Sequence, residues 1–311
     1  MIGEEATSSS SSPRLQLPWG IAYNPPNQEI LVSDGDNHRV HRFKFDFQHR
    51  RIEFLSTIGA KGGGLLYFDH PKGLCYQPFT HHILICDELN NRIQILNQNG
   101  TKHLFSVGSP RRIRSRANGE FNRPYGINCQ LDGSVMVADS VNQRMQILDA
   151  RGVFVRKCGG QDQNHDQIDA SGDSNKDSQH RLKFPHDVCV LESRWNSLTS
   201  SPSPQILVAD YGNKRVSIWN KDGSQHITNF QVSGWPLGLC VDLNGFVHVA
   251  CGGDHNVQVY EPRNNYSLVQ QLGHKGHAPG ELNWPSGLAV DEFNTLMVVE
   301  FGNNRVQFFR G

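Results

Sequence analysis

Hydrophobic residues in this chain come in short runs rich in Val, Ile and Leu, and turn residues separate the runs. Between Gly126 and Cys158 the runs read GINCQ, SVMVAD, RMQIL and VFVRKC, and Leu131-Asp132-Gly133 follows the first run as a hairpin turn. Short apolar runs bounded by turn residues are typical of β-strands. The 3.6-residue period of amphipathic helices is not found, so the pattern predicts an all-β protein.

The same order of runs and turns occurs six times along the chain. Each copy opens on a proline that is followed two residues later by glycine, or by aspartate in the fourth copy; the six prolines are Pro18, Pro71, Pro124, Pro185, Pro236 and Pro285. Five copies close on an acid, an asparagine three residues later and an arginine five residues later: Asp34-Asn37-Arg39, Asp87-Asn90-Arg92, Asp139-Asn142-Arg144, Asp210-Asn213-Arg215 and Glu300-Asn303-Arg305. The fifth copy, Cys251-Asp254-Asn256, has lost this polar signature.

Four short antiparallel strands in each repeat are the blade of a β-propeller. The sequence therefore predicts a six-bladed ring over residues 18–311, in one domain. The sixth copy ends at RVQFFRG311 without an outer strand, whereas Ile2-Gly3 and Leu15 to Pro18 match the segment that links one repeat to the next. We expect residues 1–17 to be a remnant of the closing outer strand plus a Ser-rich loop. The ring would close between the two chain ends, and the chain is expected to be either a domain of a longer protein or a native protein with an imperfect seam.

The periodic Asp, Asn and Arg residues are interpreted as scaffold. A short polar side chain can hold the turn between the second and third strands, and the arginine can pair with the acid. Residues that build every blade are poor candidates for catalysis, so the binding or catalytic residues are sought where the copies differ.

Pro-x-Gly-Ile followed by Val-Ala-Asp-x-x-Asn-x-Arg-hydrophobic resembles the NHL repeat, and the six copies cover essentially the whole chain. The closing stretch WPSGLAVDEFNTLMVVEFGNNRVQFF is similar to the last blade of the tripartite-motif NHL proteins, the group that includes Brat. The resemblance implies an RNA-binding propeller face with aromatic and basic side chains around the repeat starts. It also implies that any ubiquitin-ligase activity would lie in a RING domain outside this chain.

The residues on either side of each repeat proline are predicted to surround one mouth of the central channel. Aromatic and basic side chains are frequent among them: Trp19, His70, Lys72, Arg123, Tyr125, Phe184, His186, Trp235 and Trp284. Some of these aromatic rings could simply pack under their loops, Phe184 in particular. As a set they favour a binding surface, because bases stack on aromatic faces while basic groups neutralise phosphates.

A cluster of arginines precedes the third repeat proline. The segment SPRRIRSRANGE carries Arg111, Arg112, Arg114 and Arg116 on the predicted binding face. Loop charges are usually solvated and idle, but these lie beside an aromatic rim in a chain with 30 basic and 30 acidic residues. This loop therefore has two interpretations: four solvated charges without a function, or a phosphate-binding site.

The balanced charge provides no global attraction to nucleic acid or membrane, so any preference must be local. The seven cysteines are odd in number, form no Cys-x-x-Cys pair and lie mostly in apolar runs, which favours buried thiols in a reducing compartment over disulfides or a zinc site. The start of the chain lacks the features of a secretion signal, and no run is long enough to span a membrane. The sequence therefore predicts a cytoplasmic protein.

Two insertions interrupt the fourth repeat and its approach. Residues 159–180 are polar and acidic and are expected to form a loop on the binding face. Residues 192–205 are rich in Ser and Pro and are expected on the opposite face.

Three functions remain open. The favoured one is a non-enzymatic, monomeric domain that binds single-stranded or hairpin-loop RNA without a cofactor. The alternative is a platform for a protein or peptide, anchored by Trp235 and Trp284. A metal-dependent lyase of the NHL-like type is the remote third. His186 is the only histidine that directly follows a repeat proline, whereas a catalytic zinc needs about three protein ligands.

Overall fold

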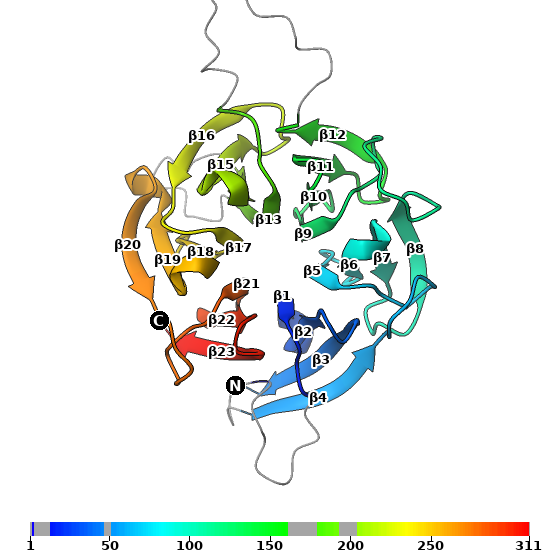
Figure 1. Ribbon diagram of the computed structural model, residues 1–311, viewed down its shortest axis with the longest axis horizontal. Coiled ribbons are helices and arrows are strands. Elements are labelled where there is room, and N and C mark those ends of the chain that lie inside the picture. The colour runs from blue at the N-terminus through cyan, green and yellow to red at the C-terminus, as the bar shows by residue number, and fades with distance from the viewer. Residues whose placement is uncertain (1, 3–12, 47–50, 161–178, 193–203, 311) are drawn as a thin grey trace, which may run out of the picture.

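Six antiparallel sheets stand around a central axis in the computed structural model, which describes residues 2, 13–46, 51–160, 179–192 and 204–310 (Figure 1). Blades one to three are β1 (Pro18–Asn24), β2 (Glu29–Asp34), β3 (Arg39–Asp46) and β4 (Arg51–Ile58); β5 (Pro71–Tyr76), β6 (Ile83–Asp87), β7 (Arg92–Leu96) and β8 (His103–Gly108); β9 (Pro124–Cys129), β10 (Val135–Asp139), β11 (Arg144–Leu148) and β12 (Phe154–Cys158). The first strand of each blade is innermost and the fourth is outermost.

The remaining three blades follow the same order. They are β13 (Pro185–Leu191), β14 (Gln205–Asp210), β15 (Arg215–Asn220) and β16 (His226–Gln231); β17 (Pro236–Val241), β18 (Val247–Cys251), β19 (Asn256–Glu261) and β20 (Ser267–Leu272); β21 (Pro285–Val290), β22 (Thr295–Glu300) and β23 (Arg305–Arg310). Short 3-10 turns η1 (Pro25–Asn27), η2 (Glu88–Asn90), η3 (Tyr211–Asn213), η4 (Gly252–Asp254) and η5 (Pro262–Asn264) complete the described elements. The prediction of an all-β, six-bladed propeller with four-stranded blades is confirmed.

Each repeat proline lies opposite the last residue of the second strand of its blade. In blade one Pro18 pairs with Asp34, and in blade two Pro71 pairs with Asp87. The six prolines and the six turns between second and third strands therefore lie on one side of the ring, which we call the proline face. The other side carries the turns between first and second strands.

The repeated acid, asparagine and arginine hold the turn between the second and third strands, as the sequence predicts. The Asp87 carboxylate accepts hydrogen bonds from Asn90 Nδ2 at 2.9 Å, from Arg92 Nε at 2.8 Å and from the backbone N–H of Asp69 at 2.8 Å. Asp69 lies two residues before the repeat proline, so a single buried carboxylate fixes both the turn and the start of the blade. Arg92 also donates to the backbone carbonyl of Gly64, which holds the preceding loop.

Glycine at the start of the innermost strand allows adjacent blades to touch through their backbones. A Cβ atom at Gly238 would lie 1.9 Å from the carbonyl oxygen of Ser286, and one at Gly20 would lie 2.4 Å from that of Lys72. Blade four departs from this rule. Asp187 replaces the glycine, and its carboxylate accepts the N–H of Leu239 in blade five and of its own neighbour Val188, both at 2.9 Å.

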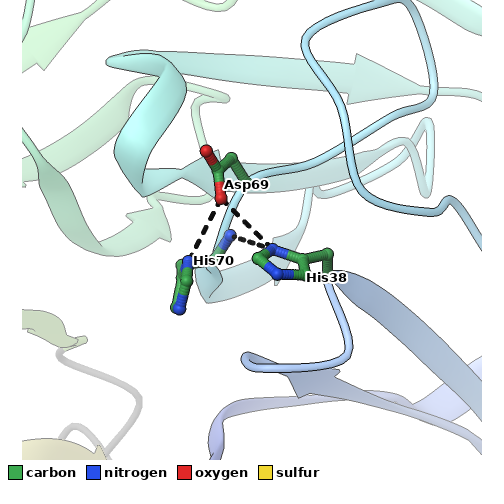
Figure 2. A group of neighbouring side chains, drawn as sticks. All are labelled: His38, Asp69 and His70. Atoms are coloured by element: carbon green, nitrogen blue, oxygen red, sulfur yellow. Dashed lines mark hydrogen bonds and ion pairs between the residues drawn. The ribbon is translucent and has the colours of Figure 1, made fainter.

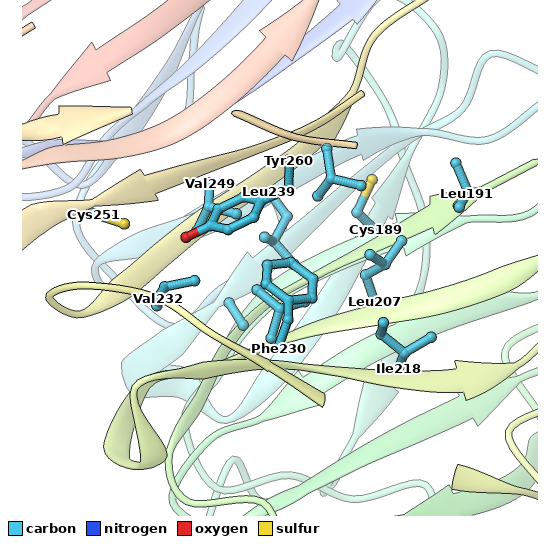
Figure 3. Packing of buried hydrophobic residues seen from close by; sticks show 13 residues of the cluster. Cys189, Leu191, Leu207, Ile218, Phe230, Val232, Leu239, Val249, Cys251 and Tyr260 are labelled. Carbon is cyan, nitrogen blue, oxygen red and sulfur yellow. The ribbon is translucent and has the colours of Figure 1, made fainter. Parts of the chain in front are cut away.

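Apolar side chains fill the wedges between adjacent blades. Between blades four and five, Leu207 and Ile218 from one sheet pack with Leu239 and Val249 from the next, and Phe230 lies among them (Figure 3). Because each blade buries one apolar face on each neighbour, no single blade has a complete core of its own.

Ile2 completes the outer edge of blade six. Its backbone exchanges hydrogen bonds of 3.1 and 2.9 Å with Val306 in β23, on the edge that faces away from β22. The Ile2 side chain is 2% exposed and packs with Ile21 of blade one. The ring is thus closed between the N- and C-terminal segments, as predicted.

The described blades are held together without disulfides. All seven cysteines are free, and all but Cys129 are buried. In the described part of the chain, no helix has the length and apolar character needed to cross a membrane.

The two insertions lie largely outside the described residues, at 161–178 and 193–203, and their predicted positions stay predictions. The described strands place the first between the end of β12 and the start of β13, and the second between β13 and β14.

Candidate functional site

Aromatic rings from opposite blades meet over the central axis on the proline face. The Trp19 ring of blade one lies with its centroid 5.6 Å from that of Tyr125 in blade three and 5.9 Å from that of His186 in blade four. Blades one and four face each other across the ring of six, so these contacts cover the mouth of the channel. Trp19, Tyr125 and His186, which the sequence predicts at the rim of the channel, therefore form a cap over its mouth.

From the cap, a row of stacked rings continues around the proline face. We call it the aromatic arc; it consists of Tyr125, His186, Tyr211, Trp235 and Trp284. Successive centroids are 4.7, 4.2, 6.0 and 6.0 Å apart, and neighbouring ring planes differ by 10 to 27°. Offset stacking of this kind is favourable between aromatic rings. The arc therefore presents a continuous aromatic surface from blade three to blade six.

His186 acts in the arc as an uncharged ring. Burial lowers the pKa of its imidazole to about 3, with the Lys72 ammonium as a second cause. Its Nδ1 has no hydrogen-bond partner among the described residues. At neutral pH the ring is therefore a stacking partner for Tyr125 and Tyr211, and not a cation.

Lys72 supports the cap from below. The side chain is buried, and its Nζ lies 4.0 Å from the centroid of the Trp19 ring and 4.0 Å from a Glu88 carboxylate oxygen. Glu88 also lies 3.5 Å from Arg123 Nη1. Burial lowers the pKa of Lys72, with the Glu88 charge acting against that shift. Two of the predicted basic residues, Lys72 and Arg123, are thus already paired with the same acid.

A cavity of about 50 Å³ lies under the cap, lined by the starts of the innermost strands. It has room for a few water molecules but not for an organic substrate. The carboxylate of Asp187 is on its wall, and burial raises the pKa of that carboxyl to about 7.

The arginine loop, residues 111–116, has a fixed backbone and exposed side chains. Asn91 Nδ2 donates to the carbonyl of Arg112 at 3.2 Å, Asn142 Nδ2 donates to that of Ser115 at 2.6 Å, and Arg144 Nη1 donates to that of Arg116 at 2.9 Å. All four arginines of this loop are exposed, and none has a carboxylate partner in the described ranges. The loop thus displays four unpaired guanidinium groups on a held backbone.

The other predicted residues divide between the surface and a blade seam. Phe184 is 39% exposed, so it does not pack under its loop. His70 is half-buried in the seam between blades one and two, where its ring lies beside His38 and Asp69 (Figure 2).

Sequence reasoning missed Tyr211 and Phe301, which belong to the same surface. Phe301 packs edge-on against Trp19 at 5.7 Å, and Tyr211 lies in the middle of the arc. Each residue directly follows the repeated acid of its blade. The position directly after the repeated acid could have identified both residues in the sequence, because the turn after the second strand opens on the same face as the repeat prolines.

The fold and its six repeats define the class of protein: a six-bladed β-propeller. Residues 15–43 match the NHL repeat family. The chain is 31% identical over 136 residues to mouse NHL repeat-containing protein 3. The aligned region covers 42% of this chain and 38% of that protein. It is 25% identical over 254 residues to the chloroplastic protein SUPPRESSOR OF QUENCHING 1 of Arabidopsis thaliana, covering 75% of this chain and 24% of that protein. The chain thus spans well under half the length of either relative.

Solved propellers share the fold at low sequence identity. A gluconolactonase from Xanthomonas campestris superposes with a TM-score of 0.63 at 15% identity, over 94% of this chain and 85% of that one. The virginiamycin B lyase of Staphylococcus aureus gives 0.57 at 12% identity, over 94% and 84%. At these identities the likeness shows the fold alone. Both neighbours are enzymes, whereas no specific resemblance to the tripartite-motif NHL proteins emerges from these matches.

Proposed function

We propose that the proline face binds single-stranded or hairpin-loop RNA, as the resemblance to the tripartite-motif NHL proteins implies. In this proposal the domain is a monomeric, non-enzymatic module of a cytoplasmic, post-transcriptional regulator such as a translational repressor. The arginine loop carries the argument. Exposed guanidinium groups without carboxylate partners keep their full charge for phosphates, and a backbone held by Asn91, Asn142 and Arg144 reduces the entropy lost on binding.

The aromatic arc supplies the second element that such a ligand needs. Stacking of a base on an exposed aromatic face contributes about 1–3 kcal/mol and is tolerant of sequence. Phe184, which directly precedes the fourth repeat proline, presents an exposed ring, and Trp235 and Trp284 are half-buried members of the arc. Phosphates on the arginines and bases on these rings would follow one path across the face.

A peptide ligand is the second candidate. The stacked pair Trp235–Trp284 and the neutral net charge favour an apolar anchor over a long polyanion. Phosphate contacts weaken steeply with salt, whereas apolar contacts do not, so salt dependence separates the two.

The test is binding of a randomised single-stranded RNA pool, followed by fluorescence anisotropy at several salt concentrations. One variant changes Arg111, Arg112, Arg114 and Arg116 to Ser. The matched control changes four exposed basic residues on the outer strands and their turns to Ser: Arg51, Lys102, Arg151 and Arg156.

Both variants lose four positive charges, but only the first is expected to weaken binding, by at least about tenfold. Its slope of log K against log salt should flatten by about 0.7 for each arginine that contacts a phosphate. If the control variant binds RNA equally weakly, the loss of affinity would come from the change in net charge and not from the arginine loop. If the folded wild type binds no RNA, the proposal fails, and Trp235→Ala and Trp284→Ala become the variants for a peptide screen.

A further inference from the structure

Two histidines and two aspartates gather in the seam between blades one and two, on the proline face. Asp36 and His38 come from the turn between β2 and β3, and Asp69 and His70 directly precede β5. Asp69 Oδ1 lies 3.2 Å from His38 Nδ1 and 3.2 Å from His70 Nδ1 (Figure 2). On its other side, His70 Nε2 lies 3.2 Å from Asp36 Oδ1.

The same seam positions in the other blades do not repeat this chemistry. At the position of His38 the copies have Asn91, Gln143, Lys214, His255 and Asn304, and at the position of Asp69 they have Gln16, Asn122, Lys183, Gly234 and Asn283. The shared scaffold role is a hydrogen bond that the turn side chain accepts from the residue before the proline, as in Arg123 N–H to Asn91 and Trp284 N–H to His255. Asn at position 38 would meet that role, so the scaffold alone does not explain the cluster.

The charges of the cluster are those of an empty cation site. The Asp36 and Asp69 carboxylates have histidine partners but no lysine or arginine within 4.0 Å in the described ranges. The cluster therefore brings together two carboxylates and two imidazole rings, the oxygen and nitrogen donors that divalent transition metals take as ligands.

We propose that His38, Asp69 and His70 bind a divalent transition metal ion such as Zn²⁺, and that this ion clips blade one to blade two. One ligand atom from each residue lies within 4.8 Å of the other two. Zinc–nitrogen bonds of about 2.0–2.1 Å in a tetrahedron separate ligand atoms by about 3.3–3.5 Å, so modest side-chain movements complete the site.

Asp36 has the position of an orienting carboxylate in this site. Metal-bound histidines commonly donate their other ring N–H to a carboxylate, which fixes the tautomer. His70 Nε2 faces Asp36 in this way and leaves Nδ1 for the metal. His38 Nδ1 now accepts a hydrogen bond of 3.2 Å from the backbone N–H of His70, which the metal bond would replace. The side chains of Asp69 and His70 are about one-third exposed, so water can fill the fourth position.

The test uses chelator-treated protein titrated with Co²⁺, whose visible absorption reports the ligand geometry, followed by competition with Zn²⁺. One ion per chain is expected. His70→Gln and Asp69→Asn each remove a ligand and should weaken binding at least about tenfold, and Asp36→Asn should weaken it about tenfold by loosening His70. The matched control is His81→Gln with His82→Gln, a histidine pair between β5 and β6 on the opposite face, which should leave the affinity unchanged.

Thermal melting of the metal-free proteins verifies that the variants are folded, because none of the three mutated side chains is fully buried. Absence of stoichiometric binding to the folded wild type would overturn the proposal. So would cobalt spectra and affinities that stay the same in His70→Gln and Asp69→Asn. The result is independent of RNA binding, since no RNA is present.

Discussion

Asp187 is the residue at which blade four breaks the repeat. Its carboxylate occupies a position that is glycine in the other five blades, and it bridges to the backbone of blade five. Two backbone N–H groups favour its charged form, but burial is the larger effect and raises its pKa to about 7.

Asp187 should make the stability of the protein depend on pH near neutrality. A folded-state pKa of about 7, above the unfolded value of about 3.9, means that the folded state binds the proton more tightly. The stabilisation is complete below about pH 4 and is lost as the pH rises through 7. Asp187→Asn cannot ionise, so its melting temperature relative to wild type should become more favourable, by a few degrees, from pH 5 to pH 8. A difference that stays constant over this range would contradict the assignment.

Residue-scale reasoning from sequence could indicate which face the side chains next to the prolines lie on, but not what surrounds each of them. The positions next to the prolines do converge on one face. Lys72, however, lies under the Trp19 ring against Glu88, and a pattern along the chain contains no information about a contact between residues of different blades.

The turn between the second and third strands is the element that organises the proline face. In blade three, Arg144 donates to the Asp139 carboxylate at 2.7 Å and to the carbonyls of Arg116, Ala117 and Glu120. A single scaffold side chain thereby links the turn to the segment that carries the exposed arginines.

Arg144→Met should destabilise the protein by about 3–5 kcal/mol, because it leaves the buried Asp139 carboxylate without its cationic partner. Arg151→Met is the control, since the Arg151 side chain is 84% exposed and its pair with Asp149 contributes less than about 1 kcal/mol. Urea unfolding of the two variants measures the difference. Similar losses in both would mean that Arg144 acts as an ordinary surface charge.

Elements were predictable where their determinants are close in sequence. In five of the six turns the acid, asparagine and arginine lie within six residues, so the repeat revealed both the turn and its hydrogen bonds. The histidine cluster combines one turn with the start of the next blade, about 30 residues away, and the aromatic arc combines residues of four blades between positions 125 and 284. Their contacts could be identified only after the ring had placed these segments side by side.

Closure of the ring includes a short backbone contact at its last seam, in addition to the packing of blade one against blade six. Ile2 is 2% exposed and is bound to Val306 through both backbone groups. Ile2→Ala should therefore lower the free energy of unfolding by about 2–4 kcal/mol, as for other buried Ile residues. Ile113→Ala, at a side chain that is 55% exposed, should change it by less than about 0.5 kcal/mol. Denaturant titration would contradict the closure role if the two variants behave alike.

The whole architecture was the most predictable level. Repeat count gave the number of blades, and the missing outer strand of the sixth copy indicated where the ring closes. The cap could not be predicted, because Trp19, Tyr125 and His186 are more than 60 residues apart at the closest spacing and meet only through the curvature of the ring.

The contact between Trp19 and His186 has a consequence for how the protein unfolds. In an open array of repeats each unit contacts only its neighbours, so units at the ends can unfold one at a time. Here a tie across the diameter joins the first blade to the fourth, in addition to the closed circle of neighbours. Loss of blade one or blade four therefore removes support from the opposite side of the ring as well as from the adjacent blades. We therefore expect the six repeats to unfold as a single cooperative unit, although each is built to the same local plan.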